Sequence, residues 1–220
     1  ASGELAPREH YTGDVAIADR NGRVLALAAL ATLEHMLPPG QAMTYSGVVE
    51  SAAPLATWQR TPAAAGHALD ARVLTMELTL KPLPARAAVE AELAAAQDGF
   101  QRERLRRRLR LLRAIGDGPG FTARAWAWRL GDALLLAQPN EAYSQLQLDL
   151  RAALPEHAVA VLNISNGGYA YLTPRSMYVR DQYQVWQSPF AEGCLETTID
   201  ACVAGLAEMG RETEDRRQMT

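Results

Sequence analysis

The chain has 220 residues, of which 48% are hydrophobic and 21% charged, and its formal net charge is −3. This length and mixture are typical of one substantial globular domain and exclude a disordered or fibrous protein. No apolar run reaches the roughly 18 residues that a membrane-spanning helix needs, so no transmembrane segment is expected. The small negative charge creates no overall attraction for nucleic acid.

The first predicted element is a helix. Apolar residues recur at helical spacing from Asp14 to Leu37, and Pro38-Pro39-Gly40 closes the segment. Met43 to Ser51 is then predicted to be a strand, and the following stretch, which is rich in proline and alanine and carries Trp58, is predicted to be a loop.

A strand and a helical hairpin are predicted next. Val73 to Leu80 alternates between apolar and polar residues, which indicates a half-buried strand. Two helical stretches follow at residues 86–97 and 101–115, and Asp98-Gly99 between them predicts a turn. Residues 86–115 are therefore expected to form a long helical hairpin.

The rest of the chain mixes strands and helices. Strands are predicted at residues 121–130, 133–137 and 157–164, the last of them buried, and helices at 141–153 and 192–209. Gly131-Asp132 predicts a tight hairpin between the first two of these strands. The expected fold is α/β of the mixed α+β kind, with layered β-sheets flanked by helices.

The predicted elements suggest one main body. No linker is long enough to divide the chain, so residues 1–209 are expected to form a single body, followed by a flexible charged tail at 210–220.

The two cysteines are expected to be free thiols. Cys194 and Cys202 lie in the last predicted helix, and eight residues of helix rise by about 12 Å. That rise exceeds the limit of roughly 7 Å between the Cα atoms of a disulfide. We therefore expect both cysteines to be buried packing residues and not to have a redox or metal-binding role. Since a protein without disulfides can be cytoplasmic or exported, the cysteines do not decide the cellular compartment.

Seven arginines gather within residues 101–113, which raises the alternative of a nucleic-acid-binding helix. Leu105, Leu109 and Leu112, however, form an apolar stripe, so the arginines occupy the remaining faces of an amphipathic helix. No aromatic residue is interleaved for base stacking. A solvated face, and no nucleic-acid partner, is the favoured interpretation.

The strongest functional signal lies between Asn163 and Phe190. A predicted strand ends in a run with Asn166 and Gly167, and four tyrosines follow it. Such loops after strands often carry binding and catalytic groups. Glu141 stands at a similar junction, after Pro139-Asn140. A carboxylate and a phenol on adjacent strand ends can form an oxygen-rich half of a metal site.

These residues resemble the neutral ceramidases and their bacterial relatives, zinc-dependent amidases that cleave the N-acyl bond of ceramide. Pro139-Asn140-Glu141 is similar to the family's Pro-Gly-Glu, and Ser165-Asn166 with the tyrosine five residues later to its Ser/Cys-Asn-x-x-x-x-Tyr segment. Further tyrosines seven and twelve residues beyond that one also match. Gly3-Glu4-Leu5-Ala6-Pro7 resembles the family's Gly-Asp-Val-Ser-Pro motif.

The resemblance implies that residues 1–209 are the C-terminal half of a catalytic domain. It implies that Glu141 and Tyr171 ligate Zn²⁺, together with two histidines from an upstream half that would be this chain's partner. Zinc would activate a water molecule for hydrolysis of a small-molecule or lipid amide. Tyr183 would donate a hydrogen bond to the reacting carbonyl oxygen, and Asn166 and Gly167 would contact substrate.

One departure from the family leaves an alternative open. Ala6 stands where the family's motif has a serine, and alanine offers neither a nucleophile nor a hydrogen bond. A zinc-dependent hydrolase is the leading hypothesis. The alternative is a catalytically inactive ceramidase-like protein that binds a lipid or a glycan.

Overall fold

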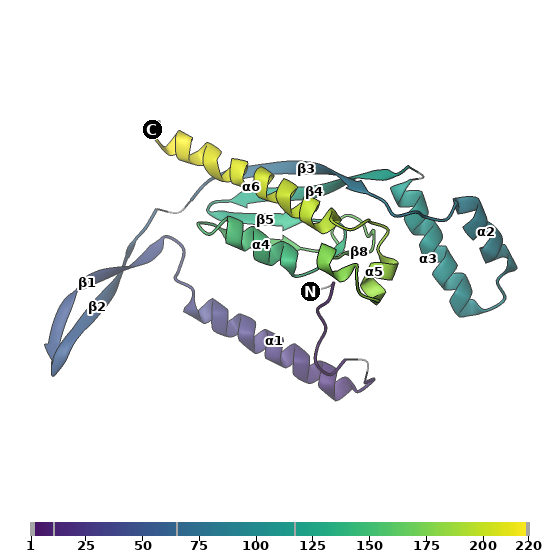
Figure 1. Cartoon of the computed structure of the whole chain (residues 1–220). Coiled ribbons are helices and arrows are strands. Elements are labelled where there is room, and N and C mark those ends of the chain that lie inside the picture. The colour runs from purple at the N-terminus through teal and green to yellow at the C-terminus, as the bar shows by residue number, and fades with distance from the viewer. Residues whose placement is uncertain (1–2, 11, 65, 117, 219–220) are drawn as a thin grey trace. The chain divides into compact units, whose positions relative to one another are not determined.

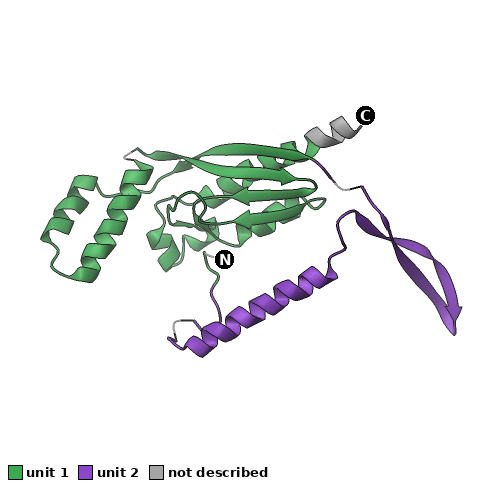
Figure 2. Ribbon diagram, turned by 180° about the vertical axis from the view of Figure 1, so that it is seen from behind, with its two compact units in different colours: residues 1–5, 68–220 green, residues 6–67 purple. Residues whose placement is uncertain are grey.

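The computed structural model describes residues 3–10, 12–64, 66–116 and 118–218, with only the backbone for residues 212–218. The chain forms two compact units, residues 6–67 and residues 1–5 with 68–220 (Figure 2). This division differs from the single body that the sequence suggested. The smaller unit has little interior of its own, since its long helix buries no residue.

The smaller unit holds one helix and one hairpin. Helix α1 (Val15–His35) is capped by Asp14, whose carboxylate accepts a hydrogen bond from the backbone N–H of Ala16 at 2.9 Å. Strands β1 (Gln41–Ser51) and β2 (Ala53–Pro62) pair antiparallel. The predicted loop around Trp58 was therefore wrong. Trp58 lies opposite Tyr45 with ring centroids 5.9 Å apart, and this cross-strand aromatic pair favours the sheet.

The larger unit is built on a four-stranded sheet in the order β3-β4-β5-β7 (Figure 1). The strands are β3 (Leu69–Thr79), β4 (Gly120–Leu130), β5 (Ala133–Ala137) and β7 (Ala158–Leu162). Pairing is antiparallel except between β5 and β7, which are parallel. The predicted hairpin between β4 and β5 is confirmed, with Gly131 at a φ of 64° in its turn. Strand β7 alternates in burial instead of being buried throughout, because only one of its faces meets the core.

Two helices cover one face of this sheet, α4 (Gln145–Ala153) and α6 (Cys194–Gln218) (Figure 1). Small side chains let α6 approach closely. Ala125 and Ala127 of β4 are fully buried, and a Cβ placed on Gly205 of α6 would come within 2.4 Å of Leu74. The helix continues to Gln218, beyond the expected end at residue 209. Residues 219–220 of the predicted flexible tail lie outside the described part of the chain.

The opposite face of the sheet is apolar over part of its area, and that part is not fully buried. Trp126 and Trp128 of β4 are half-buried, and neighbouring Val73 of β3 and Leu162 of β7 are 55% and 44% exposed. Contiguous apolar surface of this kind marks a place where further protein or ligand packs.

The helical hairpin is confirmed as α2 (Arg86–Ala95) and α3 (Gly99–Ile115). It has its own apolar cluster, in which Val89 of α2 packs with Leu105, Leu109 and Leu112 of α3. The arginines of α3 face solvent, as the amphipathic pattern predicted, and Arg107 and Arg110 both bond to Glu103. The mixed α+β class is therefore confirmed, and none of the helices described is both long and apolar enough to cross a membrane.

Short elements complete the larger unit. Strands β6 (Glu141–Ala142) and β8 (Tyr171–Leu172) form a separate two-stranded parallel sheet, followed by a 3₁₀ turn at Arg175–Met177 and helix α5 (Tyr183–Gln187). The prediction that Glu141 opens a helix was wrong. The backbone N–H of Glu141 donates to the carbonyl of Ala170 at 2.9 Å. This segment therefore forms a strand, and the helix begins only at Gln145.

Candidate functional site

Glu141 and Tyr171 lie side by side. They are register partners in the parallel pair β6–β8, and both are partly exposed. Paired residues of neighbouring strands project to the same side of a sheet, about 4.8 Å apart along the hydrogen-bonding direction. Glu141 and Tyr171, the two residues for which the resemblance implied a metal-binding role, therefore project from neighbouring strands on the same side of this small sheet.

A buried amide network holds this strand pair in place. Nε2 of Gln138 donates to the side-chain oxygen of Asn163 at 2.6 Å and to the carbonyl of Asn140 at 2.7 Å. Asn163 in turn donates to the carbonyl of Ala142 at 2.9 Å. These bonds connect the end of β5 with the end of β7. Because each of these hydrogen bonds links buried or part-buried groups, together they hold the backbone on both sides of Glu141 firmly in place.

The segment between β7 and β8 contains unusual backbone conformations. Ile164, Asn166 and Ala170 have φ values of 57°, 56° and 67°, in the left-handed region that residues other than glycine seldom adopt. For the β-branched Ile164 this conformation is especially unfavourable. Clusters of such residues occur at functional sites, where surrounding contacts hold them in place.

Tyr183 reaches the same place from helix α5. Its ring packs edge-to-face against Tyr171, with ring centroids 6.0 Å apart. Asn166 and Gly167, predicted to contact substrate, lie exposed on the segment that leads into β8. A Cβ on Gly167 would come within 3.1 Å of Pro139, so this segment lies next to the residues that precede Glu141.

The N-terminal residues also belong to this site. Gly3 packs so closely on β6 that a Cβ there would lie 2.6 Å from the carbonyl oxygen of Ala142. The carboxylate of Glu4 accepts hydrogen bonds from the hydroxyl of Ser144 and from its backbone N–H, at 3.0 Å and 3.1 Å for the latter. Glu4 thus caps the start of α4 with a group from the far end of the chain.

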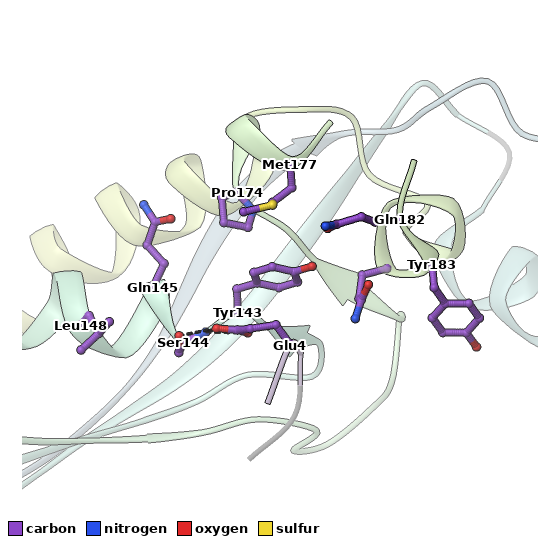
Figure 3. Close-up of a pocket in the computed structure, with 10 residues that line it drawn as sticks. Glu4, Tyr143, Ser144, Gln145, Leu148, Pro174, Met177, Gln182 and Tyr183 are labelled. Atoms are coloured by element: carbon purple, nitrogen blue, oxygen red, sulfur yellow. Dashed lines mark hydrogen bonds between the residues drawn. The ribbon is translucent and has the colours of Figure 1, made fainter. Parts of the chain in front are cut away.

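A shallow cleft of about 560 Å³ opens beside these residues (Figure 3). Its walls combine carboxylate, amide, phenol and apolar groups; it is lined by Glu4, Tyr143, Ser144, Gln145, Leu148, Pro174, Met177, Gln182, Tyr183 and Gln184. The Tyr143 ring lies at its centre, and Tyr183 stands at the end opposite Leu148 (Figure 3). Such a mixture of apolar wall and a few polar groups is typical of a small-molecule site.

Electrostatics distinguish Tyr143 in this cleft. Burial raises the pKa of its phenol, and the nearby negative charge of Glu4 raises that pKa further. Tyr143 therefore keeps its proton over a wide pH range and is available as a hydrogen-bond donor.

The oxygen donors present match part of a metal site. Carboxylate oxygen is an established zinc ligand, and four-coordinate zinc needs further donors beyond Glu141 and Tyr171. In the part of the chain that the structure describes, no three histidine, cysteine or acidic residues gather to hold a metal alone. His157, the histidine of the larger unit, lies at the other end of the sheet, where Nδ1 is 3.4 Å from the carbonyl oxygen of Asp132.

Sequence reasoning missed several residues of this site. No local sequence pattern marks Tyr143, Ser144 or Gln182. They are identified as residues of the cleft only from the three-dimensional structure, in which the segments around β6 and α5 lie together. Glu4 carried a signal, since it follows a glycine in a motif already singled out. Gly3 has a φ of 76°, which explains why a glycine stands there.

No family model and no curated protein matches the sequence. The solved structures that are similar in part include two ceramidases. The neutral ceramidase from Pseudomonas aeruginosa is 14% identical with a TM-score of 0.40, over 64% of this chain and 29% of that one. A ceramidase complexed with C2 is 14% identical with a TM-score of 0.39, over 66% and 31%. The chain thus spans less than a third of either structure, and likeness at this level carries no conclusion about activity.

Proposed function

We propose that this chain forms part of a zinc-dependent hydrolase that cleaves amide or N-acyl bonds, and that it contributes Glu141 and Tyr171 to the metal and Tyr183 to the substrate carbonyl. The substrate would be a small-molecule or lipid amide. The remaining metal ligands, two histidines, would come from residues outside this chain.

The observation that carries the proposal is the meeting of four separate segments. Gly3-Glu4, Glu141, Tyr171 and Tyr183 were singled out along the whole length of the sequence, and they lie around one small sheet and cleft. Residues brought together from distant parts of a chain, near strained backbone and beside a cleft, are characteristic of an active site.

Glu141 and Tyr171 suit a metal because both present oxygen on the same side of β6 and β8. They would supply two of the four ligands of a tetrahedral set. Zinc held there would supply Lewis-acid polarisation of the substrate's carbonyl group. The amide network of Gln138 and Asn163 would hold the backbone on both sides of Glu141 in place whether or not metal is bound.

Tyr183 has the chemistry of an oxyanion donor. A phenol hydroxyl can donate one hydrogen bond to a carbonyl oxygen as that oxygen gains negative charge. The ring of Tyr171 limits the positions that Tyr183 can occupy, and the amides of Gln182 and Gln184 line the cleft beside it. The leaving or acyl part of the substrate would lie along this cleft, over the apolar wall of Pro174 and Met177.

Exposed apolar residues on the four-stranded sheet support the proposal that further protein packs around this unit. Val73, Trp126, Trp128 and Leu162 form an apolar surface that remains partly exposed. An upstream half of the same catalytic domain would bury this surface and would bring the missing ligands.

The zinc assignment is tested in the full-length protein by metal analysis after dialysis against a competing chelator. Glu141→Ala with Tyr171→Phe is expected to weaken zinc binding by about a hundredfold or more, because even outer-shell changes cost 10–100-fold. The matched control, Glu156→Ala with Tyr45→Phe, changes the same residue types at exposed positions and should retain stoichiometric zinc. Equal retention by both double variants would show that the assignment is wrong.

The role of Tyr183 is tested by steady-state kinetics on a panel of N-acyl amides. Tyr183→Phe keeps the ring against Tyr171 and removes only the hydroxyl, so kcat is expected to fall by roughly 10²–10³. Zinc content should stay unchanged. An unaltered kcat would exclude the hydroxyl from the reaction.

Ala6 favours a second candidate, a catalytically inactive protein that binds a lipid or glycan in the same cleft. Ala6→Ser restores the hydroxyl that the resembling family carries. If both the wild type and Ala6→Ser bind an N-acyl amide by calorimetry and neither hydrolyses it, binding is the function. Turnover by the wild type would rule this candidate out.

A further inference from the structure

Lys81 is the single lysine of the chain; every other residue counted as basic is an arginine. It follows strand β3 in a segment that pairs with the residues after α5. Leu80 forms a bridge with Phe190, and the backbone N–H of Lys81 donates to the carbonyl of Pro189 at 2.9 Å. The start of the side chain is therefore held beside the C-terminal end of α5.

The ammonium group bonds to that helix end. Nζ donates to the carbonyl of Val185 at 2.5 Å and to the carbonyl of Ser188 at 3.1 Å. Val185 would normally bond to the N–H four residues later, but that residue is Pro189, which has none. Lys81 supplies the donor that the backbone lacks.

The surroundings of Lys81 restrict it further. Its Nζ lies 5.0 Å from the ring centroid of Tyr178, in a cation–π arrangement. The hydroxyl of Tyr178 donates to the carbonyl of Phe190 at 3.0 Å. Burial lowers the pKa of Lys81, so keeping the charge there has a free-energy cost, and these contacts help to offset it.

Helix α5 needs this anchor because it is short. It has five residues, none of them buried, and its first residue is Tyr183. Helices of this length are not stable by themselves. The place of Tyr183 and Gln184 therefore depends on contacts around α5: Nε1 of Trp186 donates to the Asp181 carboxylate at 2.9 Å, and Lys81 bonds to the C-terminal end.

We propose that Lys81 is a positioning residue, whose ammonium group holds the C-terminal end of α5 and thereby fixes Tyr183 against Tyr171. The importance of Tyr183 for catalysis rests on the function proposed above. The positioning itself does not, and it can be measured without metal or substrate.

The test uses Lys81→Met, which keeps most of the alkyl stem and removes the charge and all three donors. Arg108→Met, which removes an exposed cation from α3, is the matched control. Amide hydrogen exchange is followed in the peptide covering residues 182–188. The protein is also labelled with 3-fluorotyrosine, and the ¹⁹F resonance of Tyr183 is assigned with Tyr183→Phe.

In Lys81→Met, exchange in residues 182–188 is expected to rise about tenfold or more, because two hydrogen bonds to a charged group are lost. The Tyr183 resonance should shift toward its position in Tyr171→Ala, where the neighbouring ring is absent. Exchange in β3, β4 and β5 should remain as in the wild type. Lys81→Gln, which keeps a neutral donor on a shorter side chain, replaces Lys81→Met if that variant does not fold, and smaller shifts in the same direction are expected.

Unchanged exchange and an unchanged Tyr183 resonance in a folded Lys81 variant would overturn the proposal, as would equal effects from Arg108→Met. Kinetics separate it from the proposed function. If the protein hydrolyses N-acyl amides, Lys81→Met should lower kcat, and Lys81→Met with Tyr183→Phe should be no slower than Tyr183→Phe alone. If it hydrolyses none, the proposed function fails while the exchange and ¹⁹F results still decide the role of Lys81.

Discussion

Glu141 and Tyr171 face the same side of the small β6–β8 sheet as direct register partners, although a helix, a strand and a strained loop separate them in the chain. Their surroundings include contacts from residues that precede and residues that follow them in the chain. Gly3 packs against β6, and Tyr183 packs against Tyr171. Changes in these supporting contacts should therefore be measurable at the site.

Gly3→Ala should detach the N-terminal residues from β6. The new Cβ would meet the carbonyl oxygen of Ala142 at 2.6 Å, and Glu4 would then lose its bonds to Ser144. Losing a helix cap costs about 1 kcal/mol, so amide exchange at Ser144 should rise about fivefold or more. Gly13→Ala is the matched control, because Gly13 has a similar φ of 73° and nothing within 4 Å. Equal protection of Ser144 in both variants would contradict the expectation.

Cys202 should make the protein less stable at alkaline pH. Burial raises the pKa of its thiol from 9.0 to about 12. Between these values the native state keeps the proton and the unfolded state loses it, so the free energy of unfolding falls by about 1.4 kcal/mol per pH unit as pH rises. The stabilisation is complete below pH 9.

Urea unfolding from pH 8 to 11 measures this slope. Cys202→Ala should flatten it by that amount, whereas Cys194→Ala, which keeps the buried thiol of Cys202, should retain most of it. Both cysteines are free, so no disulfide complicates the comparison. Parallel slopes for the wild type and Cys202→Ala would refute the assignment.

Leu109→Ala should destabilise the α2–α3 hairpin more than the sheet. Leu109 is buried in the hairpin's own apolar cluster, and replacing a buried leucine with alanine costs about 2–5 kcal/mol. Hydrogen exchange should rise in residues 86–115 and change little in β4 and β5. Leu148→Ala, at a position 56% exposed, should cost under about 0.5 kcal/mol. A uniform rise throughout the larger unit would mean that the two clusters unfold together.

Ala170→Gly should be nearly neutral for stability. Glycine relieves the left-handed conformation at a φ of 67°, worth about 1 kcal/mol, but gives the unfolded chain a similar amount of extra freedom. Ala160→Gly, in strand β7, has only the second effect and should cost about 0.5–1 kcal/mol. Chemical denaturation compares the two. A larger loss for Ala170→Gly than for Ala160→Gly would show that Ala170 is not strained.

The sequence alone determined most of the regular elements, because each depends on a local pattern. Apolar and polar residues alternate around Leu74 and Met76, which is the period of a strand. The leucine stripe of α3 has the period of a helix. Both patterns are local and do not depend on where the segment lies in the fold. The glycine turn at residue 131 and the separation of the two cysteines are equally local. These features were predicted correctly.

Only the tertiary structure decided the elements whose partners are distant. Trp58 lies in a strand because Tyr45 faces it, and Glu141 lies in a strand because the segment ending at Tyr171 pairs with it. In both places the local residues also allowed another conformation, and hydrogen bonds to a remote segment selected the strand. Lys81 shows the same principle. Pro189 has no N–H to bond to the carbonyl of Val185, and nothing near Lys81 in the sequence indicates that its ammonium group binds that carbonyl.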